Sequence, residues 1–313
     1  MKPERVVAAV LPAVALALLL ALPCTAAARP VTQTLVFDAV AHASFVDTPP
    51  AGPSPGDTEL STARLRDASG RFVGTAHDRC VFTKVIPGDV LERCSGSAKT
   101  REGSVTVAGV GHLDSMNPPW RVIGRSGAYK GVHGTQIFST DIPLDPNVPL
   151  AAGRGFSVSV ITVISSRRLH VGVVARPAAN ATFIRRADSL CRATEAKARR
   201  LPGFPFSSFD PFHPDKHLLP QVGRFFDQPA RRRLPRTLIR QLDELGQPPA
   251  STRAWKRVLA TRRTLLSNET RQIKAALADN APAFVRTVYQ QSRDYNSMVF
   301  RSAVFGVQSC TFG

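Results

Sequence analysis

Side chains that could do chemistry are scattered through the first half of this sequence, and no common catalytic motif joins them. The set comprises Asp38, His42, His77, Asp78, Arg79, His112 and Tyr129. A Gly-x-Ser-x-Gly nucleophile elbow and a His-Glu-x-x-His zinc motif are both absent. His213 and His217 are four residues apart, but Pro214 between them indicates a loop and no third ligand is evident, so we expect no metal site.

The glycine-rich stretch 124–134, GRSGAYKGVHG, is the other candidate for chemistry. It lacks the Gly-Lys-Ser/Thr ending of a phosphate-binding loop and the Gly-x-Gly-x-x-Gly of a dinucleotide-binding helix. A predicted strand follows it, so no helix N-terminus is available for a phosphate. We therefore interpret it as a tight corner between strands and expect no cofactor.

The N-terminus has the pattern of a secretory signal peptide. Lys2 and Arg5 precede an apolar run at 6–22, and small residues follow at 25–28. These are the charged region, apolar region and cleavage site of an export signal. We expect residues 1–28 to be removed near Ala27 or Ala28, which places the protein outside the cytoplasm, in the cell envelope or secreted; an uncleaved membrane anchor is the alternative.

Four cysteines remain after such a cleavage: Cys80, Cys94, Cys191 and Cys310. An even number in an exported chain indicates two disulfides, and four cysteines allow three pairings. No Cys-x-x-Cys is present, so neither a thioredoxin-like site nor a zinc ribbon is expected. No free cysteine is then left to act as a nucleophile.

The net charge of +18 is concentrated in the second half of the chain. Residues 29–177 carry 16 Lys and Arg against 12 Asp and Glu, a net of +4, whereas residues 178–313 carry 23 against 10, a net of +13. In an exported protein this favours anionic envelope polymers or lipid headgroups as partners, and not nucleic acid. Arg231, Arg232 and Arg233 are the predicted contact; simple solubility is the alternative explanation.

Residues 29–177 have the pattern of an all-β domain. Strands are predicted at 31–45, 59–65, 72–86, 90–98, 105–111, 120–123 and 135–138, and a last hairpin at 156–164 and 169–174. Loops rich in proline and glycine separate them, for example at 47–57. Even spacing without a helical period between the strands indicates a barrel or a sandwich.

Several segments of this half resemble the allene oxide cyclase/dirigent barrel-like superfamily. They are GPSPGDTEL, RDASGRFVGTAHDRCVFTKV, ERCSGSA, SVTVAGVG and VIGRSGAYKGVHG, in that order. The resemblance implies an antiparallel barrel of about eight strands with an apolar cavity. Plant members of the superfamily either cyclise a fatty-acid epoxide or steer the coupling of phenolic radicals, but activity does not follow from fold alone.

The resemblance also implies which residues to test. A cyclase of this superfamily uses a carboxylate in its cavity, and Asp38 is the only carboxylate midway along the first predicted strand. It is therefore the candidate catalytic residue, although an ordinary exposed carboxylate is the alternative because most carboxylates on strands face water. Tyr129 and His112 are the candidates for contact with a small apolar ligand.

Two of the cysteines also fit a hairpin in this barrel. The sequence Pro87-Gly88-Asp89 predicts a turn between the strands 72–86 and 90–98. Cys80 and Cys94 are equidistant from residue 87, so their Cβ atoms should face each other across the ladder. The hairpin geometry therefore predicts the pair Cys80–Cys94.

Residues 178–313 have a helical period and predict a four-helix bundle. A first helix begins near Thr182, a second region at 221–245 is interrupted near Pro229 and Pro235, and two long helices follow. In an up-down bundle the start of the first helix and the end of the fourth lie together, which predicts the pair Cys191–Cys310. The ending FGVQSCTFG resembles uncharacterised exported helical proteins of actinobacteria.

The sequence thus predicts an α+β protein of two domains, a barrel at 29–177 and a basic bundle at 178–313. Our leading interpretation is a non-catalytic envelope protein whose barrel binds a small apolar ligand and whose bundle contacts anionic polymers or lipids. The alternatives are a cyclase or isomerase acting in the barrel, and a structural or protein-binding module. A cavity with a buried carboxylate would favour the enzyme, and a barrel filled by side chains would favour the module. The sequence does not fix the ligand or the oligomeric state.

Overall fold

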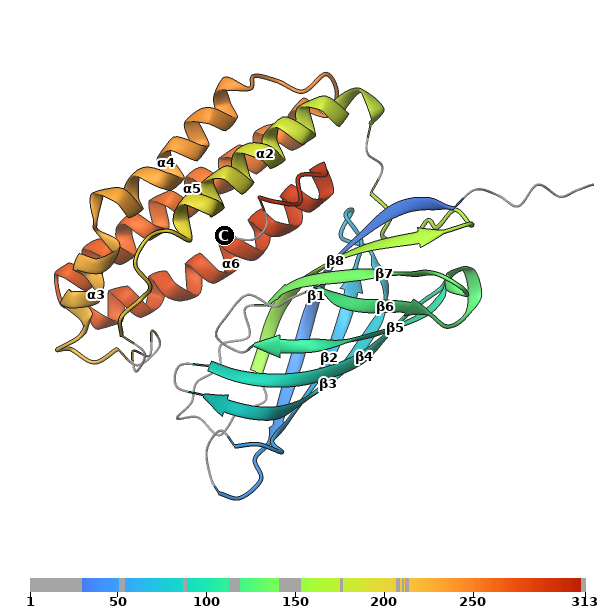
Figure 1. The fold of residues 1–313 in the computed structure, drawn as a ribbon, viewed down its shortest axis with the longest axis horizontal. Coiled ribbons are helices and arrows are strands. Elements are labelled where there is room, and N and C mark those ends of the chain that lie inside the picture. The colour runs from blue at the N-terminus through green and yellow to red at the C-terminus, as the bar shows by residue number, and fades with distance from the viewer. Residues whose placement is uncertain are drawn as a thin grey trace, which may run out of the picture.

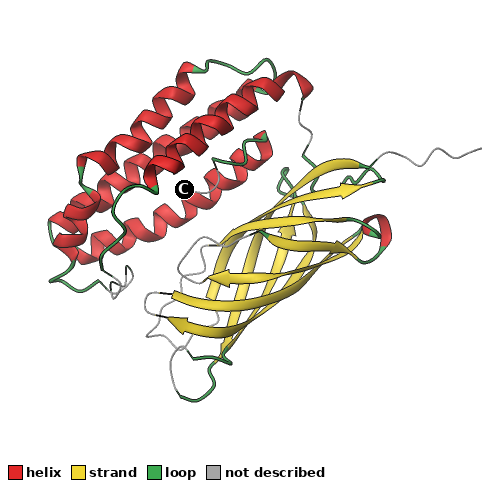
Figure 2. Ribbon diagram, viewed as in Figure 1, coloured by secondary structure: helices red, strands yellow, loops and turns green. Residues whose placement is uncertain are grey.

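The structure, a computed structural model, contains a closed antiparallel β-barrel followed by a group of helices (Figures 1 and 2). It describes residues 30–50, 54–86, 89–112, 119–140, 153–174, 177–206, 209, 211 and 214–310. The predicted α+β fold class is confirmed. The segment predicted as a signal peptide lies outside the described residues.

The barrel has eight strands, each hydrogen-bonded to its neighbours in sequence. They are β1 (Val31–Val46), β2 (Thr58–Arg66), β3 (Phe72–Ile86), β4 (Asp89–Thr100), β5 (Gly103–His112), β6 (Trp120–Gly124), β7 (His133–Thr140) and β8 (Gly153–Ser165). β1 closes the barrel by pairing with β8, with Leu35 opposite Ile161. Successive side chains of a strand point to opposite faces. Leu35, Phe37 and Ala39 therefore face inward, whereas Val36 and Asp38 face outward.

The second arm of the predicted last hairpin is not a barrel strand. β8 pairs on both sides, with β1 and β7, so it has no free edge for residues 169–174; the end of this segment instead bonds the start of β1, which β2 does not cover. That segment crosses one end of the barrel, where Leu169 and Val171 are buried. Val36 donates a backbone hydrogen bond to Gly172 and Val173 forms an isolated bridge with Leu35. The apolar pattern that we interpreted as a strand therefore belongs to a plug.

Five helices follow the barrel in the described part of the chain: α2 (Ala181–Ala198), α3 (Leu219–Phe226), α4 (Pro229–Glu244), α5 (Thr252–Leu277) and α6 (Ala281–Phe305). The predicted second helix is two, because Pro229 starts α4 at its first position, where a missing N–H costs nothing. Pro235, by contrast, lies inside α4 without ending it. Of the helices described, none is long and apolar enough to cross a membrane.

α2, α4, α5 and α6 share a core centred on Trp255, which is 1% exposed. Its ring contacts Phe183 and Phe305 at centroid distances of 5.0 and 5.1 Å. A disulfide links Cys191 in α2 to Cys310 just after α6, with Cα atoms 5.1 Å apart, and a second links Cys80 to Cys94 in the barrel, with Cα atoms 4.0 Å apart. These are the pairs that the hairpin and bundle arguments predict.

The helices and the barrel are packed against each other along α6. Met298, Val299 and Ala303 of this helix bury their side chains against the outward-facing Val36, Val158 and Val160 of β1 and β8. Figure 1 shows α6 lying beside these strands. We keep the division into a barrel and a helical domain near residue 177 as a proposal, with an apolar contact joining the two.

Candidate active site inside the barrel

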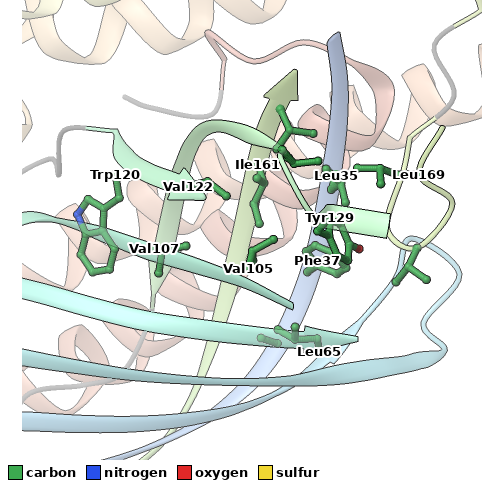
Figure 3. Packing of buried hydrophobic residues seen from close by; sticks show 14 of the residues in the cluster. Leu35, Phe37, Leu65, Val105, Val107, Trp120, Val122, Tyr129, Ile161 and Leu169 are labelled. Atoms are coloured by element: carbon green, nitrogen blue, oxygen red, sulfur yellow. The ribbon is translucent and has the colours of Figure 1, made fainter. Parts of the chain in front are cut away.

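One half of the barrel interior is filled by apolar side chains. We call it the capped half; it is built around Leu35, Phe37, Val105, Tyr129 and Ile161 (Figure 3). Little space is left among these residues: the volume that the centre of a water molecule can occupy is only about 10 Å³. That is about the least volume that one water needs, so no organic ligand fits in this half as it stands.

Tyr129, a predicted ligand contact, is part of this filling. It lies on the short helix η1 (Gly127–Tyr129) between β6 and β7 and is 3% exposed. Burial raises the pKa of its hydroxyl, which lies 3.5 Å from Thr100 Oγ1. Glu102 closes the same end by accepting backbone hydrogen bonds from His170 and Val171. The glycine-rich corner thus carries a plug.

The other half of the interior carries three carboxylates, and we call it the carboxylate half. The strand register places Glu59 opposite Cys80, Asp78 opposite Gly96, and Glu92 opposite Phe82. Cys80 and Cys94 belong to the apolar core, and cross-strand partners share a face, so all three carboxylates point into the barrel. They surround the Cys80–Cys94 disulfide on its inner side.

Glycines on the adjacent strands leave room for these carboxylates. A Cβ atom on Gly96 would overlap Oδ1 of Asp78, and one on Gly111 would overlap Oε1 of Glu92. The small residues Ser61, Ala63 and Ala76 face the same interior and are only half-buried. Asp78 and Ser61 also border an open hollow of about 640 Å³ whose other lining residues include Leu60 and Arg79 of the outer wall. Solvent therefore reaches the barrel wall at Asp78.

Aromatic rings line the same half. Phe45 and Phe82 pack edge to face with centroids 5.1 Å apart, and Phe82 is 2% exposed. Trp120 is 3% exposed, and its indole lies where a Cβ atom on Gly109 would stand. Gln136 donates a hydrogen bond to Ser159 at 3.2 Å across the inner face of β7 and β8. The surroundings of the carboxylates are thus largely apolar, with a few hydrogen-bonding groups.

Burial changes the proton affinity of two of the carboxylates. It raises the pKa of Asp78 from 3.8 to about 6, although the Ser61 hydroxyl and the nearby His77 both favour the ionised form. The pKa of Glu59 is also raised, first by burial and then by the negative charge of Asp78. A carboxyl group with a pKa near 6 can both accept and donate a proton close to neutral pH.

Glu92 is the most deeply buried of the three, at 6% exposed. One of its oxygens and the sulfurs of Cys80 and Cys94 all lie within 4.8 Å of one another, and among the described residues this is the one cluster with the spacing of a metal site. The two cysteines are bonded to each other and so do not offer the thiolates that bind zinc. This arrangement favours proton chemistry over metal ligation.

Asp38, the predicted catalytic residue, does not lie in the barrel interior. It faces outward into a groove of about 470 Å³ between the barrel and α6. Arg257, Arg293 and Arg301 line the same groove. The cavity role assigned to Asp38 by resemblance is therefore wrong for this structure. His112 ends β5, and the prediction for its side chain lies outside what the structure describes.

The inward carboxylates could have been found from the sequence. Asp78 precedes Cys80 by two residues, and Glu92 precedes Cys94 by two residues. Residues two apart on a strand share a face, and the hairpin argument already pairs the cysteines. The alternation therefore places both acids beside the disulfide. Glu59 carries no such signal, because its register depends on the pairing of β2 with β3.

Two of the three arginines of the basic run 231–233 on α4 contact other residues of the protein. The Arg231 guanidinium lies 3.8 Å from the Phe225 ring centroid and donates a hydrogen bond to the carbonyl of Pro202. Arg232 pairs with Asp227 at 2.6 Å. Of the three, only Arg233 is exposed. The predicted anionic contact of this run remains a prediction, with one exposed guanidinium to carry it.

Comparison with known proteins does not assign the chain to a family. No family model matches it, and no curated protein matches it. Among solved structures it is similar to a pyocyanin demethylase, with 17% identity, a TM-score of 0.34, and coverage of 42% of this chain and 99% of that chain.

Two Diels-Alderases give similar values. AbmU from Streptomyces koyangensis is 15% identical with a TM-score of 0.31, covering 41% of this chain and 63% of that chain. AbnU is 16% identical with a TM-score of 0.33, covering 42% and 96%. TM-scores this low do not support an argument about shared fold or function, so the site's own geometry has to carry the functional interpretation.

Proposed function

We propose that the carboxylate half of the barrel is an acid–base site that transfers a proton on a small, largely apolar molecule, as a cyclase or isomerase does. Asp78 is the group that accepts and returns the proton, and the Ser61 hydroxyl orients it. The observation that carries the proposal is Asp78 itself, an inward carboxylate that borders solvent-reachable space. This favours the enzyme alternative over a non-catalytic ligand carrier.

The two other carboxylates have supporting roles in this proposal. The negative charge of Glu59 repels a second negative charge nearby and gives the interior a negative electrostatic potential. Among the inward side chains that the structure describes on β2–β6, none is basic. An anionic substrate would meet only repulsion there, so the site suits a neutral or cationic molecule, with Phe45 and Phe82 offering aromatic contacts.

The capped half supports a second candidate function. Its close packing is that of a structural module, and if the carboxylate half is equally inaccessible then the barrel serves only as a scaffold. The two disulfides support a place of action outside the cytoplasm, since such bonds persist in oxidising compartments.

A general proton-transfer assay tests the proposal without the natural substrate. 5-Nitrobenzisoxazole loses its ring C–H proton to a carboxylate base, its N–O bond breaks, and a coloured cyanophenolate forms. We expect the full exported protein to catalyse this elimination. The rate should rise with pH around the Asp78 pKa of about 6, because Asp78 acts as a base only when it is ionised. Asp78→Asn should reduce the rate constant at least tenfold, given the 10²–10⁴-fold typical of general bases.

Asp38→Asn is the matched control, because it removes the same group from the outer face of the barrel. It should leave the rate within about twofold of the unaltered protein. Native mass spectrometry of the exported protein provides a second readout through any co-purifying small molecule. Equal rates for Asp78→Asn and the unaltered protein, together with an empty barrel by mass, would instead support the structural module.

A further inference from the structure

The barrel wall segregates its charges by face. Each carboxylate described on β2–β5 points inward, as set out above for Glu59, Asp78 and Glu92. The basic residues of β2–β6 point outward: Arg64, Arg66, Arg79, Lys84, Arg93, Lys99 and Arg121. Arg125, directly after β6, is also exposed. Of the outward side chains that the structure describes on these strands, none is acidic. The outer wall is therefore a sheet face of one sign.

Among the described residues, no ion pair neutralises the positive charge at the centre of this wall. In the part of the chain that the structure describes, no carboxylate forms an ion pair with Arg79, Arg93, Arg121 or Arg125. Arg125 is oriented by donating to Thr106 Oγ1 at 2.9 Å, a contact that leaves its charge in place. Clustered guanidinium groups without partners repel one another, so a bound anion would stabilise them.

Two open hollows of about 640 and 740 Å³ lie on the outer wall. The first is lined by residues such as His77 and Arg125 and is also bordered by Asp78; the second is lined by residues such as Arg93 and Val110. Arg79 and Arg121 border both hollows. A continuous track therefore runs over β3–β6 with two guanidinium groups at its middle.

This wall is also free of the helices. α6 contacts β1, β7 and β8, and Figure 1 shows the helices along that side of the barrel, away from β3 and β4. A hollowed face follows a flexible chain better than a flat bilayer, which would rest on its rims. Guanidinium forks match the geometry of phosphate and carboxylate groups.

We propose that the outer wall of β2–β6 binds a linear polyanion bearing repeated phosphate or carboxylate groups, with Arg79 and Arg121 at the centre of the contact. The site is distinct from the basic run 231–233, and one of its hollows is also bordered by Ser61 and Asp78 of the proposed acid–base site. It would hold the exported protein on an anionic polymer with the helices and the opposite side of the barrel exposed.

Binding of the full exported protein to long-chain polyphosphate and to polygalacturonate, measured by titration calorimetry at two salt concentrations, tests the proposal. The two polymers distinguish phosphate from carboxylate as the recognised group. We expect the double variant Arg79→Gln/Arg121→Gln to bind at least one of them on the order of tenfold more weakly, with the slope of log K against log salt smaller by about 2.

Arg186→Gln/Arg224→Gln is the matched control, since it removes the same charge from exposed positions on α2 and α3. Its affinity should change less than about threefold. Circular dichroism and melting temperature establish that each variant is folded. The proposal is overturned by equal losses in both double variants, or if neither polymer binds detectably. It is also overturned if anionic phosphatidylglycerol vesicles bind more tightly than both polymers through the same two arginines.

Discussion

The two halves of the barrel interior are built from the same strands and differ in almost every other respect. β1 contributes Phe37 to the capped half and Phe45 to the carboxylate half, and the first ring is 3% exposed whereas the second is half-buried. The capped half has apolar side chains, a plug and space for about one water. The carboxylate half has small residues, glycines and three acids.

This difference separates what stabilises the barrel from what the barrel can do. Close-packed apolar groups contribute stability in proportion to the surface that they remove from water. Buried ionised groups reduce stability and persist where function requires them. The capped half therefore stabilises the fold, whereas the carboxylate half lowers stability as a functional site would. The predictions below test that division.

The largest effect should come from the same substitution made in each half. Phe37→Ala removes a buried ring that packs directly against Gly172 and should lower the free energy of unfolding by about 3–5 kcal/mol. Phe45→Ala removes a ring that is only half-buried and should cost less than about 2 kcal/mol. Urea unfolding followed by circular dichroism measures both, and equal losses would mean that the two halves are packed alike.

A smaller effect, of opposite sign, is expected from Asp78→Asn. The folded pKa of Asp78 is raised from 3.8 to about 6 by burial, so the folded state holds this proton more tightly than the unfolded chain. The stability of the unaltered protein should fall as pH rises from about 4 to about 6, by up to about 3 kcal/mol. The asparagine variant does not titrate there and should be more stable at pH 7 by a similar amount.

Asp67→Asn provides the matched contrast outside the barrel interior. Burial alone would raise the pKa of Asp67, but hydrogen bonds from Ser69 and Arg71 lower it overall. Ionised Asp67 therefore stabilises the fold above its unfolded pKa, and its replacement should destabilise the protein at pH 7. Thermal melts of both variants from pH 4 to pH 7 would contradict the division if Asp78→Asn were also destabilising at neutral pH.

The sequence predicted what depends on local pattern and on pairing along the chain. Strand alternation and turn residues predicted the barrel, and the hairpin centred near Pro87 places Cys80 opposite Cys94 as the structure has them. The sequence analysis missed features that depend on which face of a strand points into the barrel. Asp38 sits mid-strand, as expected, but its face is the one that α6 covers, and a linear sequence does not show where a distant helix packs.

The plug was missed for a similar reason. The run 169–174 has the apolar pattern of a strand, but β8 is already paired with β1 and β7, so the run cannot extend a hairpin with β8 and bonds the start of β1 instead. Within the site, the alternation of side chains along a strand could have predicted that Asp78 and Glu92 face inward. The raised pKa of Asp78 could not be predicted, because it depends on burial that only the folded barrel creates.

The smallest expected effect is a change in the pKa of Glu59 when the neighbouring Asp78 is replaced. Glu59 and Asp78 lie on the same inner face of adjacent strands, two residues apart in register. Diagonal positions of this kind are about 7–8 Å apart at the backbone, close enough for charges to interact where water is scarce. The negative charge of Asp78 is the second cause of the raised pKa of Glu59, after burial.

Asp78→Asn should therefore lower the pKa of Glu59, while burial keeps it above the ordinary value of 4.5. The ¹³C chemical shift of the Glu59 carboxyl group, followed as a function of pH, measures the change directly. Asp67→Asn, which removes a carboxylate outside the barrel interior, should leave that titration unmoved. If Glu59 titrates identically in all three proteins, bulk water screens the two groups, and the carboxylate half is then an open, solvated mouth in which neither group has the desolvated environment that acid–base catalysis near neutral pH requires.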